Sequence, residues 1–445
     1  MKSTAAWLTV LFLRINKEHF MAEINETPSG MRTHIGFFGK TNSGKSSLIN
    51  ALSRQDVSIV SSEPGTTTDP VYKAVEIAPI GPCLLIDTAG LEDETTLGSL
   101  REKRTAKALE ESDVIVLVFD PDSSSDSETF IKKLSEKIDD KVPVIPVITK
   151  TDSVDREALD ELKEKIVADT GGAAFDSGVY VSNRTEGGKN KAKMPNEKII
   201  GVSSLTGEGV DDLRKAIIDA VGCLPTRTVL QGMVTEGDIV MLVMPQDKQA
   251  PKGRLILPQV TTLRELLDVH ARTICVAPEE MSSALSMLKE APSLIITDSQ
   301  VFDYVYERKP DESRLTSFSI LFAGLKGDID VFTEGAKAID SLRPGSRILV
   351  AESCSHAPLE EDIGREKIPN LIRKKVGGEI IVDIAAGKDF PEDLSGYDLI
   401  LQCGGCMVNR RQIMNRVKNA VSQGVPITNY GIAIAYLKGI LDKIG

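Results

Sequence analysis

The chain has 445 residues, enough for about three domains at roughly 150 residues each. Its composition, with 41% hydrophobic and 27% charged residues, is that of a globular protein. The net charge of −12 argues against broad binding to nucleic acid or to an anionic membrane, because both require a basic face. We therefore expect neither as a partner. Six cysteines are too sparse for a secreted disulfide scaffold.

Residues 1–31 are expected to form an N-terminal extension. The apolar run Ala5–Leu13 is shorter than the roughly 20 residues that a transmembrane helix needs. Charged residues follow it, without the small-residue cleavage site of a signal peptide. We favour an upstream extension before a second start at Met21, and we expect a soluble, cytoplasmic protein.

Between residues 32 and 225, short apolar runs alternate with helical stretches. We expect strands at His34–Phe38, Val71–Ala78, Cys83–Ile86, Val114–Phe119, Val144–Ile148 and Ile199–Val202. This alternation predicts an α/β domain with a mostly parallel, doubly wound sheet. The segment Gly171–Glu197, rich in Gly, Asn, Lys and Ser, is expected to be a surface insertion.

The stretch from Gly39 to Ser46 fits the P-loop pattern G-x-x-x-x-G-K-[ST]. It directly follows a predicted strand and opens a helix, and its glycines let backbone N–H groups approach phosphates. Lys45 is expected to reach the β- and γ-phosphates, and Ser46 to ligate Mg²⁺. A glycine-rich turn without a ligand is the structural alternative, but the full spacing in this context favours a nucleotide site.

Two later segments are placed to sense the γ-phosphate. Thr67 lies in the threonine-rich loop Gly65–Asp69 and is expected to ligate Mg²⁺ when a γ-phosphate is present. Asp87 follows a predicted strand, and its carboxylate is expected to hold Mg²⁺ through water. The N–H of Gly90 is expected to contact the γ-phosphate.

The segment T-K-T-D from Thr149 to Asp152 follows another predicted strand. The Asp152 carboxylate can accept hydrogen bonds from guanine N1–H and N2–H₂, a pair that adenine lacks, so the segment favours GTP over ATP. Ser203 and Ser204 are expected to close over the base. The residues expected to bind GTP are Gly39, Asn42, Ser43, Gly44, Lys45, Ser46, Ser47, Thr67, Asp87, Gly90, Thr149, Lys150, Asp152, Ser203 and Ser204.

With these motifs, residues 33–222 resemble GTPases of the TrmE-Era-Era-like group. By this resemblance, Asn42 matches the P-loop asparagine that helps to coordinate K⁺ in potassium-activated members, which implies K⁺ dependence. Thr149 stands where the group more often has Asn. No residue that orients the attacking water is identified, so the catalytic residue is unknown, and we expect slow hydrolysis and a switch function.

Two smaller α/β units are expected to follow, at residues 226–316 and 317–445. In the first, we expect strands at Ile239–Met244, Arg254–Leu257, Ile274–Val276 and Leu294–Thr297, and helices at Leu263–His270 and Pro278–Glu290. In the second, we expect strands at Ser319–Phe322, Arg347–Val350, Glu379–Ile384, Leu399–Gln402 and Pro426–Asn429, and helices at Lys367–Val376 and Arg411–Ser422.

Half of the cysteines lie late in the chain. Cys354 and His356 follow one predicted strand, and Cys403 and Cys406 follow another, so both loops can meet at one edge of a sheet. These side chains suit a Cys₃His zinc site, or a [4Fe–4S] cluster with three cysteines and an exchangeable fourth position. A redox disulfide between Cys403 and Cys406 is a third option. Spacing alone does not separate zinc from iron–sulfur.

A TrmE-like G domain, a middle α/β unit and a C-terminal C-x-H…C-G-G-C pattern together resemble the HydF family of [FeFe]-hydrogenase maturation GTPases. The resemblance covers nearly the whole chain. It implies that Cys354, Cys403 and Cys406 hold a [4Fe–4S] cluster, with His356 as a candidate fourth ligand. Gln402 stands where the family usually has His, which fits an exchangeable fourth site.

The same resemblance implies a carrier that receives a diiron precursor with CO, CN⁻ and a bridging dithiolate, made with two radical-SAM maturases. The carrier delivers this precursor to apo-[FeFe]-hydrogenase, and K⁺-stimulated GTP hydrolysis acts as a switch. The expected domains are an extension at 1–31, a GTP-binding domain at 32–225, a dimerisation domain at 226–316 that forms a homodimer, and a cluster-binding domain at 317–445.

Two alternatives stay open. The G domain also suits a tRNA-modifying GTPase, but the acidic charge and the ending Leu441–Gly445, which lacks that subgroup's C-x-G-K, disfavour it. The C-terminal cysteines also suit a structural zinc module on a signalling GTPase. One bound zinc and no iron would favour that alternative.

Overall fold

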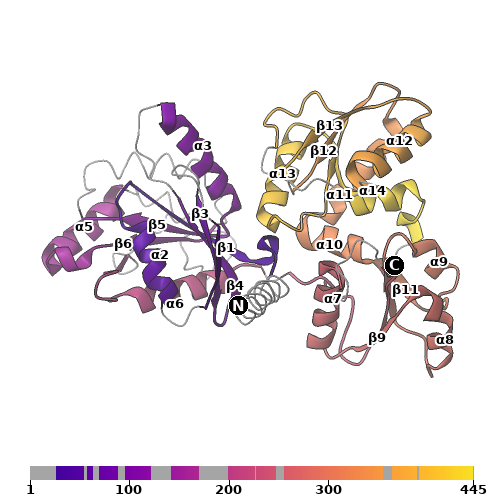
Figure 1. The fold of residues 1–445 in the computed structure, drawn as a ribbon, viewed down its shortest axis with the longest axis horizontal. Coiled ribbons are helices and arrows are strands. Elements are labelled where there is room, and N and C mark those ends of the chain that lie inside the picture. Colours follow the sequence, from indigo (N-terminus) through magenta and orange to yellow (C-terminus); the bar gives the residue numbers. More distant parts are fainter. Residues whose placement is uncertain are drawn as a thin grey trace, which may run out of the picture. The chain divides into compact units, whose positions relative to one another are not determined.

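The computed structural model describes residues 27–54, 58–63, 70–88, 96–121, 142–169, 199–225, 227–246, 255–353, 363–387 and 390–443. The chain divides into two compact units, Met1–Leu224 (unit 1) and Pro225–Gly445 (unit 2) (Figure 1). Outside the described residues lie most of the predicted extension, the predicted insertion at Gly171–Glu197, and the predicted site residues Thr67, Gly90, Cys354 and His356.

Unit 1 alternates strands and helices, as the sequence predicts. Its described strands are β1 (Thr33–Gly39), β2 (Ser58–Glu63), β3 (Val71–Ile77), β4 (Gly81–Asp87), β5 (Val114–Phe119), β6 (Val144–Ile148) and β7 (Ile200–Gly201). Its described helices are α2 (Lys45–Arg54), α3 (Thr96–Glu111), α5 (Arg156–Asp169) and α6 (Val210–Gly222), with short 3₁₀ turns at Ser29–Met31 and Thr151–Ser153.

The strands of unit 1 form a sheet in the order β2-β3-β4-β1-β5-β6-β7. The neighbouring strands β4, β1, β5, β6 and β7 pair in parallel. Strand β3 pairs antiparallel with both β2 and β4. Strand β2 was not predicted, because the stretch Ser58–Glu63 contains only two apolar residues and forms the edge of the sheet. The expected mostly parallel, doubly wound sheet is confirmed.

Helices cover both faces of this sheet. Alternate residues of β1 point to opposite faces, so Ile35 and Phe37 pack with α2 and α6, whereas Phe38 packs with α3 and α5. Every residue of β5 is buried, as expected for a central parallel strand covered on both sides. The carboxyl ends of the parallel strands therefore lie together at one edge, where the nucleotide motifs follow them.

Unit 2 contains two four-stranded parallel sheets among its described residues, in the orders β11-β10-β8-β9 and β13-β12-β14-β15. The first consists of β8 (Ile239–Val243), β9 (Arg272–Val276), β10 (Leu294–Thr297) and β11 (Arg314–Ser317), with helices α7 (Leu257–Asp268), α8 (Met281–Ser286) and α9 (Phe302–Tyr306). The second consists of β12 (Arg347–Ala351), β13 (Ile381–Ala385), β14 (Leu399–Gln402) and β15 (Ile427–Asn429), with α12 (Ile368–Val376) and α13 (Arg410–Ser422).

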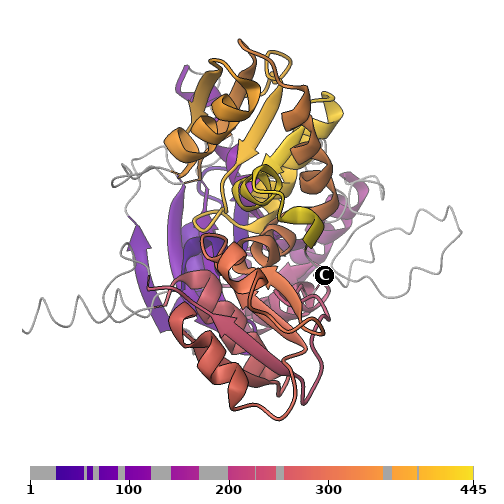
Figure 2. The same cartoon turned by 90° about the vertical axis from the view of Figure 1, so that its right-hand side faces the viewer.

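Three further helices of unit 2 lie around the junction of its sheets: α10 (Phe318–Lys326), α11 (Ile329–Lys337) and α14 (Tyr430–Leu437). Figure 2 shows the two sheets one above the other, with the second in yellow tones. Helix α10 packs against α7 on one side and against α13 and α14 on the other. Ala435 and Ile440, near the end of the chain, also pack on the first sheet.

Two predicted strands of unit 2 are wrong. The stretch Ser319–Phe322 lies in helix α10, whose start is capped by Ser317, because its side chain accepts a hydrogen bond from the Ile320 N–H. Phe318, Leu321, Phe322 and Leu325 do recur at the spacing of one helix face, but the apolar residues between them make the run look continuous and strand-like. In the predicted strand Arg254–Leu257, Leu257 begins α7, while Arg254 lies outside the described residues.

None of the helices in the described ranges combines the length and the apolar character that crossing a bilayer requires.

Candidate functional site

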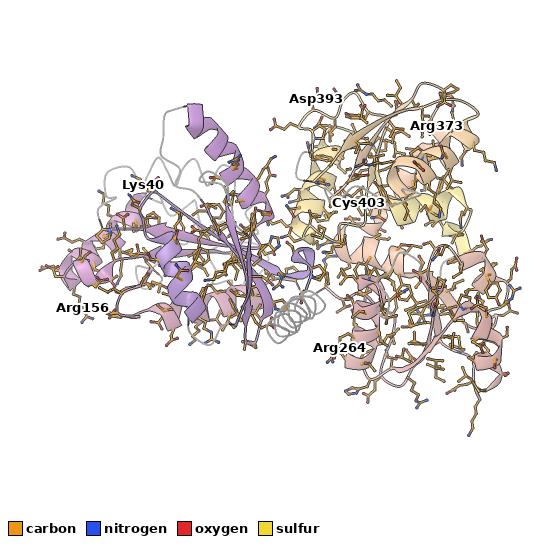
Figure 3. The ribbon with its side chains drawn as sticks, in the orientation of Figure 1. Lys40, Arg156, Arg264, Arg373, Asp393 and Cys403 are labelled. Atoms are coloured by element: carbon orange, nitrogen blue, oxygen red, sulfur yellow. The ribbon has the colours of Figure 1, made fainter. Side chains whose placement is uncertain are left out.

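The P-loop connects the end of β1 to the start of α2. Asn42 and Gly44 have φ values of 62° and 86°, the left-handed conformation that Asn and Gly adopt most readily. At Gly39, a Cβ would lie 2.4 Å from the Val118 carbonyl oxygen, so a side chain does not fit there. The loop and the first amides of α2 together form an anion cradle; Lys40, labelled in Figure 3, belongs to this loop.

Lys45 is buried, and its Nζ donates to the carbonyls of Gly39 (3.1 Å) and Lys40 (2.7 Å). Burial lowers the pKa of Lys45, while the nearby carboxylates Asp87 and Asp120 act in the opposite direction. A buried ammonium with two carbonyl partners is a ready donor for phosphate oxygens.

The predicted magnesium ligands Ser46 and Asp87 lie side by side. Ser46 Oγ donates to Asp87 Oδ2 at 2.5 Å. The other carboxylate oxygen, Oδ1 of Asp87, is buried and has no hydrogen-bond partner among the described residues. Burial raises the pKa of Asp87, opposed by the Ser46 hydrogen bond and the Lys45 charge. A hydroxyl next to an unsatisfied carboxylate oxygen fits the oxygen ligands that Mg²⁺ prefers.

Thr149 follows β6 and is 1% exposed. Its hydroxyl Oγ1 contacts two backbone carbonyls, donating to Ser43 at 2.6 Å and lying 3.1 Å from that of Phe119. A Cβ on Gly44 would lie 3.2 Å from the same hydroxyl. Thr149 therefore ties the base-recognition segment to the P-loop, a contact that does not need the amide of the more usual Asn.

Asp152 and Ser203 come together from separate loops. Ser203 Oγ donates to Asp152 Oδ1 at 2.5 Å, and the Ser203 side chain is buried. Asp152 itself is exposed, which leaves the carboxylate accessible to a base. The hydrogen bond sets the orientation of the carboxylate before any ligand binds.

Sequence reasoning missed Asp120, which follows β5 and is 5% exposed. Its Oδ2 lies 3.9 Å from Lys150 Nζ, and its charge also acts on Lys45. The negative charge of Asp120 thus lies close to the positive charges of Lys45 and Lys150 in the nucleotide site. The signal that the sequence offered was its place directly after the predicted strand Val114–Phe119.

The structure thus gathers most of the predicted nucleotide residues at the carboxyl ends of β1, β4, β6 and β7. These residues are Gly39, Asn42, Ser43, Gly44, Lys45, Ser46, Ser47, Asp87, Thr149, Lys150, Asp152, Ser203 and Ser204.

In unit 2, Cys403 directly follows β14 and is labelled in Figure 3. Cys403 is half-buried and Cys406 is exposed. Between them, Gly405 has a φ of 67°, and a Cβ there would lie 2.7 Å from Ile413 Cδ1. Glycine adopts this left-handed conformation without strain, and a side chain here would also displace Ile413.

The Cys403 sulfur has several polar neighbours. The Ser353 N–H donates to Sγ at 3.1 Å, and the Ser353 hydroxyl oxygen lies 3.1 Å from the same sulfur. Gln402 Nε2 also points to it, at 3.5 Å. Gln402 is fully buried at the end of β14.

Within the described ranges, no group of three or more His, Cys, Asp or Glu side chains is placed to hold a metal ion. Cys354 and His356, the other half of the predicted ligand set, lie outside those ranges. The described residues therefore include two sulfurs of the predicted ligand set, those of Cys403 and Cys406. Cysteine is a residue type that both iron–sulfur clusters and zinc accept as a ligand.

Family models match three separate parts of the chain. The 50S ribosome-binding GTPase model matches residues 34–150, in unit 1. The hydrogen maturase F dimerization domain matches residues 229–327, and the hydrogen maturase F tetramerization domain matches residues 330–444. Both of the latter matches lie in unit 2.

Among curated proteins, the tRNA modification GTPase MnmE of Thermotoga petrophila is 30% identical over 207 residues, which cover 45% of this chain and 39% of that protein. GTPase Der of Wolinella succinogenes is 38% identical over 152 residues, covering 33% of this chain and 31% of that protein. The chain thus spans well under half the length of these relatives. The solved G domain of the Thermotoga maritima FeoB iron transporter is 22% identical, with a TM-score of 0.27, over 42% of this chain and 98% of that chain.

Proposed function

Because the chain belongs to the hydrogen maturase F family of GTPases, we propose that it is a scaffold and carrier for [FeFe]-hydrogenase maturation. One observation carries the proposal: two family-specific domains fill unit 2, and a GTPase domain with a complete P-loop lies in unit 1. Residues 32–225 would bind GTP, residues 226–316 would dimerise, and residues 317–445 would hold an iron–sulfur cluster.

For GTP, the residues of unit 1 supply a role for each part of the nucleotide. The P-loop amides would hold the phosphates, and Lys45 would exchange its two carbonyl partners for β- and γ-phosphate oxygens. Asp152, oriented by Ser203, would accept the two donors of the guanine edge.

Ser46 and Asp87 would hold Mg²⁺, together with Thr67 from the sequence pattern. Oδ1 of Asp87 supports this assignment, because it is buried and no group in the described part of the chain forms a hydrogen bond with it. When bound, Mg²⁺ would neutralise the negative charge that develops on the phosphates during hydrolysis. Gly90 would contact the γ-phosphate, and the residue that orients the attacking water is not assigned.

Asn42 would help to bind K⁺ at the P-loop. Its side chain is exposed, and its φ of 62° suits Asn or Gly. We expect GTP hydrolysis to be faster in KCl than in NaCl. Asn42→Gly removes the amide and keeps the backbone conformation, so it should abolish the difference between the two salts while Mg²⁺-dependent GTP binding persists. A K⁺ stimulation of unchanged size in this variant would remove Asn42 from the K⁺ site.

In unit 2, Cys354, Cys403 and Cys406 would hold a [4Fe–4S] cluster, with His356 as a candidate fourth ligand. The hydrogen-bond donors around Cys403 Sγ support a metal-bound sulfur there, because such a sulfur only accepts hydrogen bonds. When bound, the cluster would offer an exchangeable iron position near which the diiron precursor could dock.

The cluster is tested by iron, sulfide and zinc analysis of the protein purified without oxygen. We expect iron and sulfide in the wild type and loss of most of both in Cys403→Ser, because serine replaces a thiolate ligand. Cys275→Ser is the matched control, since Cys275 is an exposed cysteine of unit 2 on β9 and should keep the cluster.

One zinc and no iron in the wild type would favour the structural zinc module instead. A Cys403→Ser protein with a full cluster and full ability to mature hydrogenase would refute the proposed ligand set.

The cargo and partners of the scaffold would be those of hydrogenase maturation. The diiron precursor would arrive from two radical-SAM maturases and pass to apo-[FeFe]-hydrogenase. The dimerization and tetramerization domains indicate oligomeric assembly, which for the first of these domains agrees with the expected homodimer.

A tRNA-modifying function is the second candidate, because the similarity to tRNA modification GTPase MnmE extends over 207 residues. That stretch covers 45% of the chain and leaves the two family-specific domains unexplained. The net charge of −12 of the whole chain also disfavours tRNA binding. Co-purification of tRNA with the wild type would support this candidate.

A further inference from the structure

Arg416 is a buried cation beside the cysteine loop of unit 2. It lies on α13 and is 8% exposed. Its guanidinium donates to Gln402 Oε1 (3.1 Å) and to the Gly387 carbonyl (2.8 Å), and its Cζ lies 5.1 Å from the centre of the Phe390 ring. All of these partners are neutral, and no carboxylate among the described residues pairs with it.

A buried charge without a counter-charge is costly, typically by several kcal/mol. Burial accordingly lowers the pKa of Arg416. A neutral side chain would serve better at this position if packing were its only role. Among the described residues, the one group that opposes this effect is Cys403, whose negative charge as a thiolate raises the pKa of Arg416. The guanidinium therefore suits a site where negative charge gathers at the Cys403 sulfur.

Arg416 also settles which way the buried amide of Gln402 points. A guanidinium only donates hydrogen bonds, so the Gln402 atom that it contacts must be the oxygen Oε1. The other end of the amide, Nε2, then faces Cys403, where it lies 3.5 Å from Sγ and 3.2 Å from the carbonyl oxygen. The donor end of Gln402 is thus held toward the sulfur.

Ser353 approaches the same sulfur from β12's end. Its N–H donates to Cys403 Sγ at 3.1 Å, and its hydroxyl is 3.1 Å from that sulfur. A metal-bound sulfur has no hydrogen to donate, so the hydroxyl can then turn to donate to it as well. In the structure, the backbone N–H and the Gln402 amide donate to this sulfur, and the hydroxyl accepts from its thiol. The hydroxyl becomes a third donor once the sulfur is bound to a metal.

We propose that Gln402, oriented by Arg416, and Ser353 donate hydrogen bonds to the cluster-bound sulfur of Cys403 and thereby raise the reduction potential of the cluster. This inference rests on the proposed cluster at Cys403. Reduction adds one electron to the cluster, supplied by an external reductant, and breaks no ligand bond. Donors to sulfur and a buried cation stabilise the more negative reduced form. Gln402 is then a positioning residue and not a ligand.

The test uses the full chain, loaded with its cluster without oxygen, in the variants Gln402→Met and Arg416→Met. Both substitutions keep a long side chain and remove the donor or the charge. We expect iron and sulfide content close to wild type. A redox titration with dithionite, monitored by EPR, measures the one-electron reduction of the cluster. In both variants we expect this equilibrium to shift at least tenfold toward the oxidised cluster, which lowers the reduction potential by about 59 mV.

Arg410→Met is the matched control. Arg410 begins the same helix and is half-buried, but it donates to the carbonyls of Gly324, Leu325 and Gly327 at the end of α10. Its loss should lower stability and leave the potential unchanged. Ser353→Ala removes the hydroxyl and keeps the N–H, so it should shift the equilibrium less than Gln402→Met.

If the Met variants do not fold, Gln402→Glu and Arg416→Lys replace them. Gln402→Glu keeps an acceptor for Arg416 and removes the donor to sulfur, so the shift should persist. Arg416→Lys keeps the charge and should restore part of the potential.

Three outcomes would contradict the inference. If the Gln402 and Arg416 variants have full iron content and the same reduction potential as Arg410→Met, the inference alone is overturned. Loss of iron in folded Gln402→Met would make Gln402 a ligand and overturn it too. A wild type without iron would overturn the proposed function, and the inference with it.

Discussion

At the scale of single residues, both candidate sites depend on polar side chains, most of them buried, that form hydrogen bonds with other protein groups. Lys45 and Thr149 contact backbone carbonyls, and Ser203 contacts the Asp152 carboxylate. Each contact holds a functional group in one orientation before a ligand arrives, which reduces the entropy that binding must remove. In unit 2, the hydrogen bond from Arg416 likewise orients the Gln402 amide, so that its Nε2 points toward the Cys403 sulfur.

Thr149→Val tests the contact between the P-loop and the base segment. Valine has nearly the same shape but no hydroxyl, so the Ser43 carbonyl loses its donor at a buried position. We expect the free energy of unfolding of unit 1 to fall by about 1–3 kcal/mol, with weaker GTP binding. Chemical denaturation and calorimetric titration with GTP measure the two effects.

Thr261→Val is the control for that substitution, because the Thr261 hydroxyl donates only within its own helix, to the Leu257 carbonyl. It should change stability by less than about 0.5 kcal/mol. Equal effects of the two substitutions on GTP binding would contradict the role assigned to Thr149.

At the scale of elements, unit 2 depends on helices that pack very closely against strands. Helix α11 lies against β15, and a Cβ on Gly335 would come 2.0 Å from the Ile427 carbonyl oxygen. Thr428 on the same strand donates to the Phe332 carbonyl of α11 at 2.7 Å. The absence of a side chain at Gly335 therefore sets the distance between helix and sheet.

Gly335→Ala is expected to force α11 away from β15. The added methyl meets backbone, which cannot rotate aside, so we expect a loss of about 3 kcal/mol in the stability of unit 2. In Gly396→Ala the nearest atom is Arg347 Nη1 at 3.6 Å, an ordinary contact, and stability should hardly change. Urea denaturation, monitored by circular dichroism, compares the two variants. Similar unfolding midpoints would show that α11 and β15 are not in close contact in solution.

At the scale of the whole molecule, the nucleotide site and the Cys403 loop belong to different compact units. Each unit has its own hydrophobic clusters, so each has the means to unfold by itself. Any coupling between GTP turnover and cluster chemistry must then pass from one unit to the other as a change in their relative stability or arrangement.

Differential scanning calorimetry tests this independence. We expect two unfolding transitions, of which only one responds to nucleotide. Mg²⁺ and GDP at about 100 times the dissociation constant should stabilise unit 1 by about 2.7 kcal/mol, equal to an upward shift of about 5–10 °C. A single transition that moves as a whole would instead mean that the two units unfold cooperatively.

The sequence by itself determined the features that local pattern encodes. The P-loop from Gly39 to Ser46, the alternation of strands and helices in unit 1, and most strand positions follow from spacing and periodicity alone. The same is true of the two short cysteine patterns. These features depend on residues that are neighbours in the chain, so no tertiary information was needed.

Tertiary structure alone decided the rest. Helix α14 is buried on several sides and lacks an amphipathic period. In α10, apolar residues on the other sides of the helix obscure the helical spacing, so neither run reveals a helix by itself. Asp120 and Arg416 carry no motif, and only the order of strands and the packing of α13 bring them to their sites. Their roles arise from burial and from contacts between distant residues, which a linear pattern does not record.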